Sequence, residues 1–228
     1  MAKSLGFKNH LKLVAFDLDG TLTCIDSIWR YLHEALGTWD RASIYAKRYE
    51  RHEISYEEWA RLDVALWKDI PIGRIKELVD RIPYVANAKE AIRILRLRGM
   101  KVGVISAGLT ILTERASREL ELDFAFANAL KVQHGRLTGD IEVFVTFDGK
   151  GSILRSIREG YGLRAYECAA VGDDETDISL FQEAGTRIAF NPKSPRLEAL
   201  ADVTIRSCDL MEVLRFLGLN EKPIRCYS

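Results

Sequence analysis

The sequence lacks an excess charge of either sign. Its 33 lysines and arginines balance its 33 aspartates and glutamates, and no run of basic residues stands out. A nucleic acid is attracted by a concentrated positive field, which this composition does not supply. We therefore expect no nucleic-acid partner.

Long apolar stretches are missing as well. A membrane-spanning helix needs about 20 consecutive apolar residues, and no stretch of that kind occurs. Met1–His10 contains lysines, but no apolar segment long enough for a signal peptide comes after them. We expect a soluble, cytoplasmic protein with no membrane partner, present as a monomer or a homodimer.

Cysteine is scarce and dispersed. No two cysteines have the close spacing of a zinc or redox motif, so we predict four reduced thiols. They are Cys24, Cys168, Cys208 and Cys226. The four histidines are equally scattered, which indicates solvated or packed side chains rather than metal ligands.

The chain does contain an alternation of short apolar runs with helical patterns. The expected strands are Leu11–Phe16, Val102–Ser106, Ala169–Gly172, Arg187–Phe190 and Asp202–Ile205. The expected helices are Ala88–Arg98, Ser152–Glu159, Asp177–Ala184, Pro195–Leu200 and Leu210–Leu217. This alternation predicts an α/β fold, a doubly wound parallel sheet of the Rossmann-like kind, with sites at the carboxyl ends of its strands.

Two segments interrupt the alternation. Phe124–Val132 and Ile141–Phe147, joined by a turn at His134–Arg136, have the period of a β-hairpin. Residues 24–84 contain no strand-like run and show helical spacing throughout, with a capping-box pattern at Ser55 and Glu58. We predict a catalytic core of residues 1–23 and 85–228 and an inserted helical cap of residues 24–84.

The candidate site begins where the first strand ends. Phe16–Thr23 reads FDLDGTLT and places Asp17 and Asp19 directly before a glycine and a hydroxyl. An Asp-Gly turn explains such a motif alone, but it does not explain three further groups of polar residues at comparable places. These groups are Ser106–Gly108, Lys150 between two glycines, and Gly172–Asp177, which all fall at one edge of one sheet.

These four motifs resemble those of the haloacid-dehalogenase-like phosphohydrolase superfamily, and within it most closely the phosphoserine phosphatase group. Asp123–Asn128, Leu137–Asp140 and Asp177–Gly185 match that group in order and spacing, so the resemblance covers nearly the whole chain.

The resemblance implies a magnesium-dependent phosphatase that hydrolyses a small phosphorylated metabolite through an aspartyl-phosphate. Asp17 would be the nucleophile, and Asp19 would act first as general acid and then as general base. The phosphate would be held by Gly20, Thr21, Ser106, Ala107, Gly108 and Lys150. Mg²⁺ would be held by Asp17, the backbone carbonyl of Asp19, Asp173 and, directly or through water, Asp177.

The chain departs from the phosphoserine phosphatase pattern at two places. Thr176 stands where the fourth motif of that group has asparagine. In the cap, Asp26 matches a substrate-binding acid in type, whereas counting back from Lys68–Pro71 places Asp63 where an arginine should bind the substrate carboxylate. With Tyr56, these are the expected substrate-selecting residues. An acid at Asp63 would repel a substrate carboxylate, which favours small esters without one, such as sugar or polyol phosphates.

Several alternatives remain open. Arg61, two positions before Asp63, could supply the missing contact, which would make the chain a true phosphoserine phosphatase. A phosphotransferase or phosphomutase would use the same aspartyl-phosphate with a different acceptor. Dehalogenases of the superfamily lack the second acid, so Asp19 favours phosphoryl transfer. A non-catalytic binding module is disfavoured because Asp17, Asp19, Lys150 and Asp173 are all present.

Overall fold

The structure, a computed structural model, describes residues 10–219. The predicted thiol of Cys226 and nearly all of Met1–His10, where no signal peptide is expected, lie outside these residues. Within them, Cys24, Cys168 and Cys208 form no disulfide.

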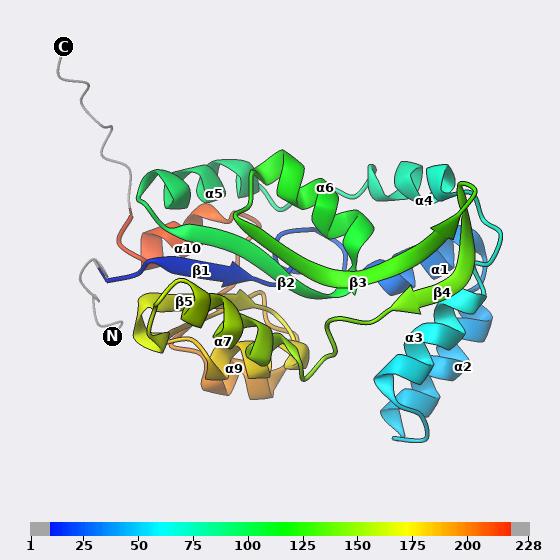
Figure 1. Cartoon of the computed structure of the whole chain (residues 1–228). Helices are drawn as coiled ribbons and strands as arrows, with labels where there is room; N and C mark the ends of the chain where they lie inside the picture. The colour runs from blue at the N-terminus through cyan, green and yellow to red at the C-terminus, as the bar shows by residue number, and fades with distance from the viewer. Residues whose placement is uncertain (1–9, 220–228) are drawn as a thin grey trace, which may run out of the picture.

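The centre of the molecule is a seven-stranded sheet in the order β4-β3-β2-β1-β5-β6-β7 (Figure 1). The strands are β1 (Leu13–Phe16), β2 (Lys101–Leu109), β3 (Phe124–Gln133), β4 (Arg136–Glu142), β5 (Cys168–Gly172), β6 (Thr186–Phe190) and β7 (Val203–Ile205). All neighbours pair in parallel except β3 and β4. The predicted α/β fold is confirmed.

Helices cover both faces of this sheet. They are α5 (Ala88–Leu97), α6 (Thr110–Leu120), α7 (Lys150–Gly160), α8 (Ile178–Gln182), α9 (Pro195–Leu200) and α10 (Met211–Phe216). α5 and α6 lie on one face and α7 and α9 on the other (Figure 1). With both faces covered, β1 has no solvated side, and all four of its residues are buried.

The hairpin differs from its predicted register. The structure places its second strand at Arg136–Glu142 rather than at Ile141–Phe147. His134 and Gly135 both have positive φ, 50° and 76°, so they form a two-residue turn, and the return strand starts at once. The alternating apolar pattern continues past Glu142, but those residues leave the ladder.

The hairpin is continuous with the main sheet, because β3 belongs to both. The first residues of β3 pair in parallel with β2, and its later residues pair with β4. β3 therefore belongs to the main sheet and carries the hairpin beyond its edge.

Residues 24–84, named here the helical insert, contain four helices in the predicted region. They are α1 (Ile28–Leu36), α2 (Trp39–Glu50), α3 (Tyr56–Ala65) and α4 (Ile72–Val79). At the N-terminus of α3, the hydrogen bond expected from Ser55 and Glu58 forms: the amide of Glu58 donates to Ser55 Oγ at 3.1 Å. Gly37 ends α1 with φ of 70°. The domain boundaries at 23/24 and 84/85 stay a prediction.

Backbone hydrogen bonds join the helical insert to the hairpin. The amides of Asp69 and Ile72 donate to the carbonyls of Leu137 and Gly135, and the amide of Leu137 donates to Ile70. The link between α3 and α4 thus extends the edge of β4 like a short extra strand. None of the described helices is long and apolar enough to cross a membrane.

Candidate active site

Four loops meet at the carboxyl ends of β1, β2 and β5 and at the start of α7. They surround a cavity of about 130 Å³, named here the site cavity. One side of the site cavity is polar and carries Asp17, Asp19, Ser106, Lys150, Asp173 and Thr176. The lining also includes side chains of the helical insert and Phe147. The four predicted motifs are therefore brought together.

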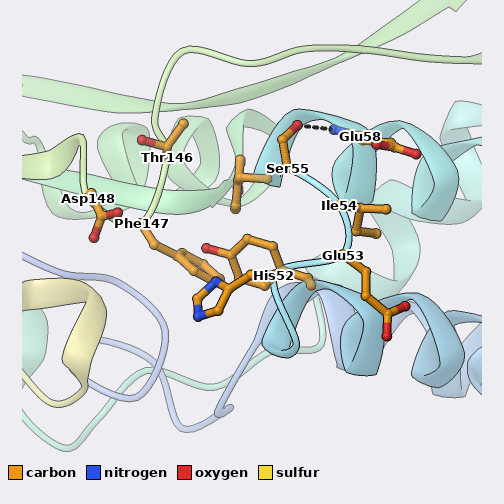
Figure 2. Close-up of a pocket in the computed structure, with 10 residues that line it drawn as sticks. His52, Glu53, Ile54, Ser55, Glu58, Thr146, Phe147 and Asp148 are labelled. Carbon is orange, nitrogen blue, oxygen red and sulfur yellow. Dashed lines mark hydrogen bonds between the residues drawn. The ribbon is translucent and has the colours of Figure 1, made fainter.

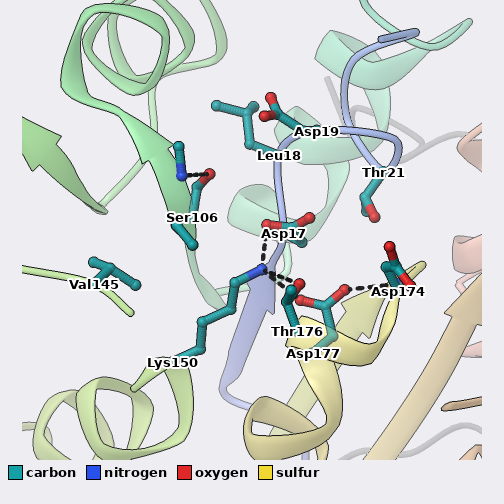
Figure 3. Close-up of polar contacts among 12 residues, drawn as sticks. Asp17, Leu18, Asp19, Thr21, Ser106, Val145, Lys150, Asp174, Thr176 and Asp177 are labelled. Carbon is teal, nitrogen blue, oxygen red and sulfur yellow. Dashed lines mark hydrogen bonds and ion pairs between the residues drawn. The ribbon is translucent and has the colours of Figure 1, made fainter. Parts of the chain in front are cut away.

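Lys150 is the central cation of the site cavity. Its Nζ donates to Asp17 Oδ1 and Asp177 Oδ1, at 2.7 Å each, and to Thr176 Oγ1 at 3.3 Å (Figure 3). Burial lowers the pKa of Lys150, but the charges of Asp17 and Asp177 more than offset this and hold that pKa above its usual value. The ammonium is therefore kept charged beside Asp17.

Gly151, the residue after Lys150, helps to position the lysine. Lys150 is the first residue of α7, and a Cβ on Gly151 would lie only 2.3 Å from the carbonyl oxygen of Ser179. The absence of a side chain at Gly151 lets α7 approach the α8 segment closely. This contact brings the lysine under the carboxylates.

Asp17 and Asp19 have different surroundings, as their expected roles require. Burial raises the pKa of Asp17, and the charge of Asp177 adds to this against the opposing effect of Lys150. Asp19 accepts from the amide of Ile28 at 2.8 Å through Oδ2, while its buried Oδ1 has no hydrogen-bond partner among the described residues.

Burial, followed by the charge of Asp17, raises the pKa of Asp19 to about 7. A carboxyl group with this pKa can hold a proton near neutral pH, as a general acid must.

Two predicted phosphate ligands lie close to Asp173. The hydroxyl of Thr21 is fully buried and donates to Asp173 Oδ1 at 3.0 Å, so it orients a carboxylate instead of facing the site cavity. Gly20 does not line the site cavity either. It has φ of 81°, and a Cβ there would lie 2.3 Å from Asp173 Oδ2, so this glycine lets Asp173 approach the first motif. Phosphate binding by Thr21 and Gly20 stays a prediction.

The second motif has the geometry expected of a phosphate loop. Ser106, Ala107 and Gly108 all line the site cavity at the end of β2. Ser106 Oγ accepts from the amide of Gly108 at 3.0 Å, which turns the hydroxyl back over the loop (Figure 3). The loop is fixed from behind, where Ala107 O accepts from Tyr56 Oη at 2.7 Å and from Trp29 Nε1 at 3.2 Å.

Asp17, Asp173 and Asp177 offer carboxylate oxygens that lie within 4.8 Å of one another, and all three side chains are buried. Burial, followed by the charge of Asp177, also raises the pKa of Asp173. Buried carboxylates whose pKa values rise for this reason gain from a hard cation between them, and oxygen donors are the ligands such an ion prefers. The donor set fits Mg²⁺. Asp177 already accepts from the amides of Asp173 and Asp174 at 2.9 and 3.2 Å, which fixes it in place.

Sequence reasoning missed two residues of the site. Lys193, three residues after β6, lies between the helical insert and the core, with Nζ 2.9 Å from Asp173 Oδ2 and 2.7 Å from Asp26 Oδ1. Its signal was its place at the carboxyl end of a predicted strand, the same edge as the other motifs.

Asn128 is the second missed residue and is fully buried. Its Nδ2 donates to Ala107 O, Tyr56 Oη and Val145 O at 2.9–3.0 Å, and its Oδ1 accepts from the amides of Phe144 and Val145. Asn128 therefore ties the phosphate loop to the segment that leaves β4.

Residues 14–182 match the family of haloacid dehalogenase-like hydrolases. The chain belongs to this family. It is 38% identical to the phosphoserine phosphatase of Methanocaldococcus jannaschii over 207 residues, 90% of this chain and 97% of that protein. The family match and the similarity to phosphoserine phosphatases show that the chain is a phosphoric monoester hydrolase.

Solved structures agree. A substrate-bound phosphoserine phosphatase has a TM-score of 0.79 and 37% identity, and a phospho-aspartyl intermediate analogue of phosphoserine phosphatase has a TM-score of 0.78 and 37% identity. Each alignment covers 90% of this hydrolase and 98% of the other chain. The predicted resemblance to the haloacid-dehalogenase-like superfamily and its phosphoserine phosphatase group is confirmed.

The three expected substrate-selecting residues of the hydrolase lie in three different places. Asp26 lines the site cavity and pairs with Lys193. Tyr56 lies behind the phosphate loop. Asp63 is buried inside the helical insert, where its Oδ2 lies 3.3 Å from His33 Nε2, and it does not line the site cavity. Asp63 therefore cannot repel a substrate carboxylate directly, and that part of the interpretation is corrected.

Arg61 is exposed on α3, and among residues 10–219 no arginine lines the site cavity. The alternative of a true phosphoserine phosphatase is consistent with the relatives and stays open. Thr176, where related motifs have asparagine, lines the site cavity and accepts from Lys150, so the substitution keeps a polar contact there.

Proposed function

We propose that this hydrolase is a magnesium-dependent phosphatase that transfers the phosphoryl group of a small phosphate monoester first to Asp17 and then to water. The observation that supports it most is the pairing of two carboxyl groups with separate environments at the end of β1. Burial raises the pKa of both Asp17 and Asp19 to about 7, but Asp17 accepts a hydrogen bond from the charged Lys150, whereas Asp19 has one buried oxygen without a hydrogen-bond partner among the described residues.

In the first half-reaction, a carboxylate oxygen of Asp17 attacks phosphorus, and the bond between phosphorus and the ester oxygen breaks. Asp19 gives its proton to the departing alcohol. In the second half-reaction, the ionised Asp19 takes a proton from water, whose oxygen attacks phosphorus and releases Asp17 and inorganic phosphate. Ser106, the loop amides and Lys150 hold the phosphoryl oxygens throughout.

Asp17 and Asp173, and Asp177 directly or through water, would hold Mg²⁺, with the backbone carbonyl of Asp19 as the further predicted ligand. The ion would neutralise charge that builds up on the phosphoryl oxygens. Lys193 and Thr21 keep Asp173 in position for this role.

The substrate proposed is a small phosphate monoester without a carboxylate. Its support is the lack of any arginine lining the site cavity among residues 10–219, together with the pairing of Lys150 and Lys193 to aspartates. The second candidate is phosphoserine, which the names of the relatives favour. We also propose that the helical insert acts as the cap over the site, excluding water from the first half-reaction.

The test is hydrolysis of a panel of phosphate esters by the purified chain, with Mg²⁺ and with excess EDTA. We expect release of phosphate with Mg²⁺ only, and a phosphorylated peptide containing Asp17 after acid quenching. An added alcohol that receives the phosphoryl group in place of water would identify a phosphotransferase. Full activity in EDTA would falsify the metal proposal.

A cytoplasmic location is proposed as well. The exposed cysteines Cys24 and Cys208, which form no disulfide among the described residues, support a reducing compartment.

A further inference from the structure

Three aromatic side chains line the site cavity. They are Trp29, Trp59 and Phe147, named here the aromatic wall. The ring centroids of Trp29 and Trp59 lie 6.1 Å apart, and those of Trp59 and Phe147 lie 5.6 Å apart, so the rings form one continuous surface. A leaving group pointing away from Asp17 would meet this surface.

The aromatic wall is fixed from behind. Trp29 stacks on Trp67 at 5.9 Å and donates its Nε1 to Ala107 O, while Trp59 stacks on Tyr49 at 5.1 Å. Rings that are already held in place lose little conformational freedom when a ligand binds. The aromatic wall is therefore preorganised for contact with a substrate.

Acidic residues also lie near the site cavity. Phe147 also lines a neighbouring surface hollow of about 500 Å³, whose lining includes Glu53, Glu58, Asp148 and His52 (Figure 2). Glu53 lies within ion-pair distance of Arg48 and Arg51, whereas no lysine or arginine of residues 10–219 lies within that distance of Glu58 or Asp148. Five aspartates line the site cavity, and when the proposed general acid Asp19 is protonated the other four still outnumber Lys150 and the neighbouring Lys193.

Mg²⁺ and the phosphate dianion cancel each other's charge, so the negative excess stays when both are bound. A positively charged leaving group gains from this field and from the faces of the aromatic rings, which attract cations. A carboxylate is repelled by the same field. A neutral polyol gains only contact with the rings.

We infer that the leaving group of the physiological substrate carries an ammonium, preferably methylated, and no carboxylate, so that the substrate is a phosphate ester of an amino alcohol. This inference rests on the proposed phosphatase function and names its substrate class. Trp59 and Phe147 are the specificity-determining residues, because they contact the leaving group but not the phosphoryl group.

The test compares esters that differ in one property at a time. Phosphocholine and 3,3-dimethylbutyl phosphate have the same shape and differ only in the charge of the head group. Phosphoethanolamine and phosphoserine differ in the carboxylate. Ethyl phosphate, which has no head group, reports hydrolysis as such. We expect kcat/KM for phosphocholine to exceed that for its uncharged analogue about tenfold, as a cation–π contact predicts, and phosphoethanolamine to exceed phosphoserine.

Variants test whether the aromatic wall causes the preference for phosphocholine over its uncharged analogue. Trp59→Leu should reduce the ratio of phosphocholine to its uncharged analogue to about twofold, and Phe147→Leu gives an independent measurement if Trp59→Leu does not fold. Trp39→Leu is the matched control, since Trp39 lies in the helical insert but contacts Arg30 and does not line the site cavity. This control should keep the ratio.

Equal rates for phosphocholine and its uncharged analogue would overturn the inference, and so would phosphoserine leading the series. Both results would leave the phosphatase function intact, because the esters would still be hydrolysed. An unchanged ratio in Trp59→Leu and Phe147→Leu would overturn the role of the aromatic wall. If the purified chain with Mg²⁺ hydrolyses none of the esters, ethyl phosphate included, the proposed function itself fails and the inference with it.

Discussion

The amino group of Lys150 contacts both the first and the fourth motif of the site. It binds Asp17 and Asp177 at 2.7 Å each and is almost fully buried. A buried cation with two anionic partners is costly to remove, because the partners then keep unpaired charges in a poorly hydrated place. The lysine therefore serves both to position the nucleophile and to lower the charge of the site.

Asp17→Asn should fold normally and lose hydrolysis by at least about 10³-fold, because the amide keeps the shape of the side chain but cannot attack phosphorus. Steady-state release of phosphate from the best ester of the panel measures this. Asp40→Asn, an exposed position on α2, is the control and should keep full activity. Turnover by Asp17→Asn beyond the level expected from contamination or deamidation would exclude Asp17 as the nucleophile.

Asp63 concerns stability rather than specificity. Its carboxylate pairs with His33, whose Nδ1 accepts from Trp67 Nε1 at 3.2 Å. Asp63→Ala should therefore lower the free energy of unfolding by about 1–3 kcal/mol, the cost of leaving a buried polar partner unpaired.

Chemical denaturation measures this loss, and the ratio of kcat/KM for phosphoserine to that for ethyl phosphate should stay within about twofold of the parent value. This kcat/KM ratio decides whether Asp63 affects substrate choice. A strong rise in phosphoserine hydrolysis by Asp63→Ala would return Asp63 to the substrate-selecting residues.

At the scale of elements, β2 and β3 are held together at their beginning by Asp123. Its Oδ2 accepts from the amide of Val102 at 3.0 Å, and its Oδ1 accepts from Lys101 Nζ at 2.9 Å. Burial acts against ionisation, but these two donors more than offset it and hold the pKa of Asp123 below its usual value. The ionised form therefore stabilises the fold.

Because the pKa of Asp123 is lower in the folded than in the unfolded state, its contribution is complete above the unfolded value of about 3.9 and is lost as the pH falls through the folded value. Asp123→Asn should cost about 1 kcal/mol at pH 7, and the difference from the parent should shrink below about pH 4. Denaturant titrations at both pH values measure it. A difference that stays constant on acidification would show that the charge of Asp123 is not what stabilises the strand pair.

The sequence was informative where local pattern decides the structure. Three of the four motifs could be placed at one edge because each comes after an apolar run, and parallel strands bring their carboxyl ends together. Lys150 comes after no such run and was placed by its flanking glycines and the order of the motifs. Asp63 was misplaced although a signal existed. Ala60, Asp63, Val64 and Trp67 have the helical spacing of one face, and all four are buried. An acid within such a stripe indicates an interior partner, but His33 lies on another helix and could not be named.

The prediction of the second hairpin strand was wrong for a different reason. Alternation predicts an extended chain but not its partner. Residues after Glu142 keep the alternation, yet Asn128 takes the amides of Phe144 and Val145 through its side chain. Two hydrogen bonds to one buried side chain thus take the place of the strand pairing predicted for these residues. A local sequence pattern cannot show such a distant partner.

At the scale of the whole molecule, the buried acids of the site lower the stability of the metal-free fold. A ligand that binds only the folded state stabilises it by about 2.7 kcal/mol at 100 times its Kd. Mg²⁺ at that level should therefore raise Tm by about 5–10 °C in a protein of this size.

Thermal melts with Mg²⁺ and with EDTA test this. Asp173→Asn should lose most of the shift, while Asp40→Asn should keep it. The same shift in Asp173→Asn as in the parent would place the stabilising ion elsewhere.

The central position of β1 affects how the chain is made. β1 pairs with β2 on one side and with β5 on the other, and β5 lies in the last third of the sequence. On the ribosome, β1 emerges early but keeps an unpaired apolar edge until β5 has been synthesised. Such an edge is a template for aggregation, and closing so long a loop slows folding. The proposed catalytic centre, whose residues come from both sides of this gap, therefore forms only after β5 has been synthesised.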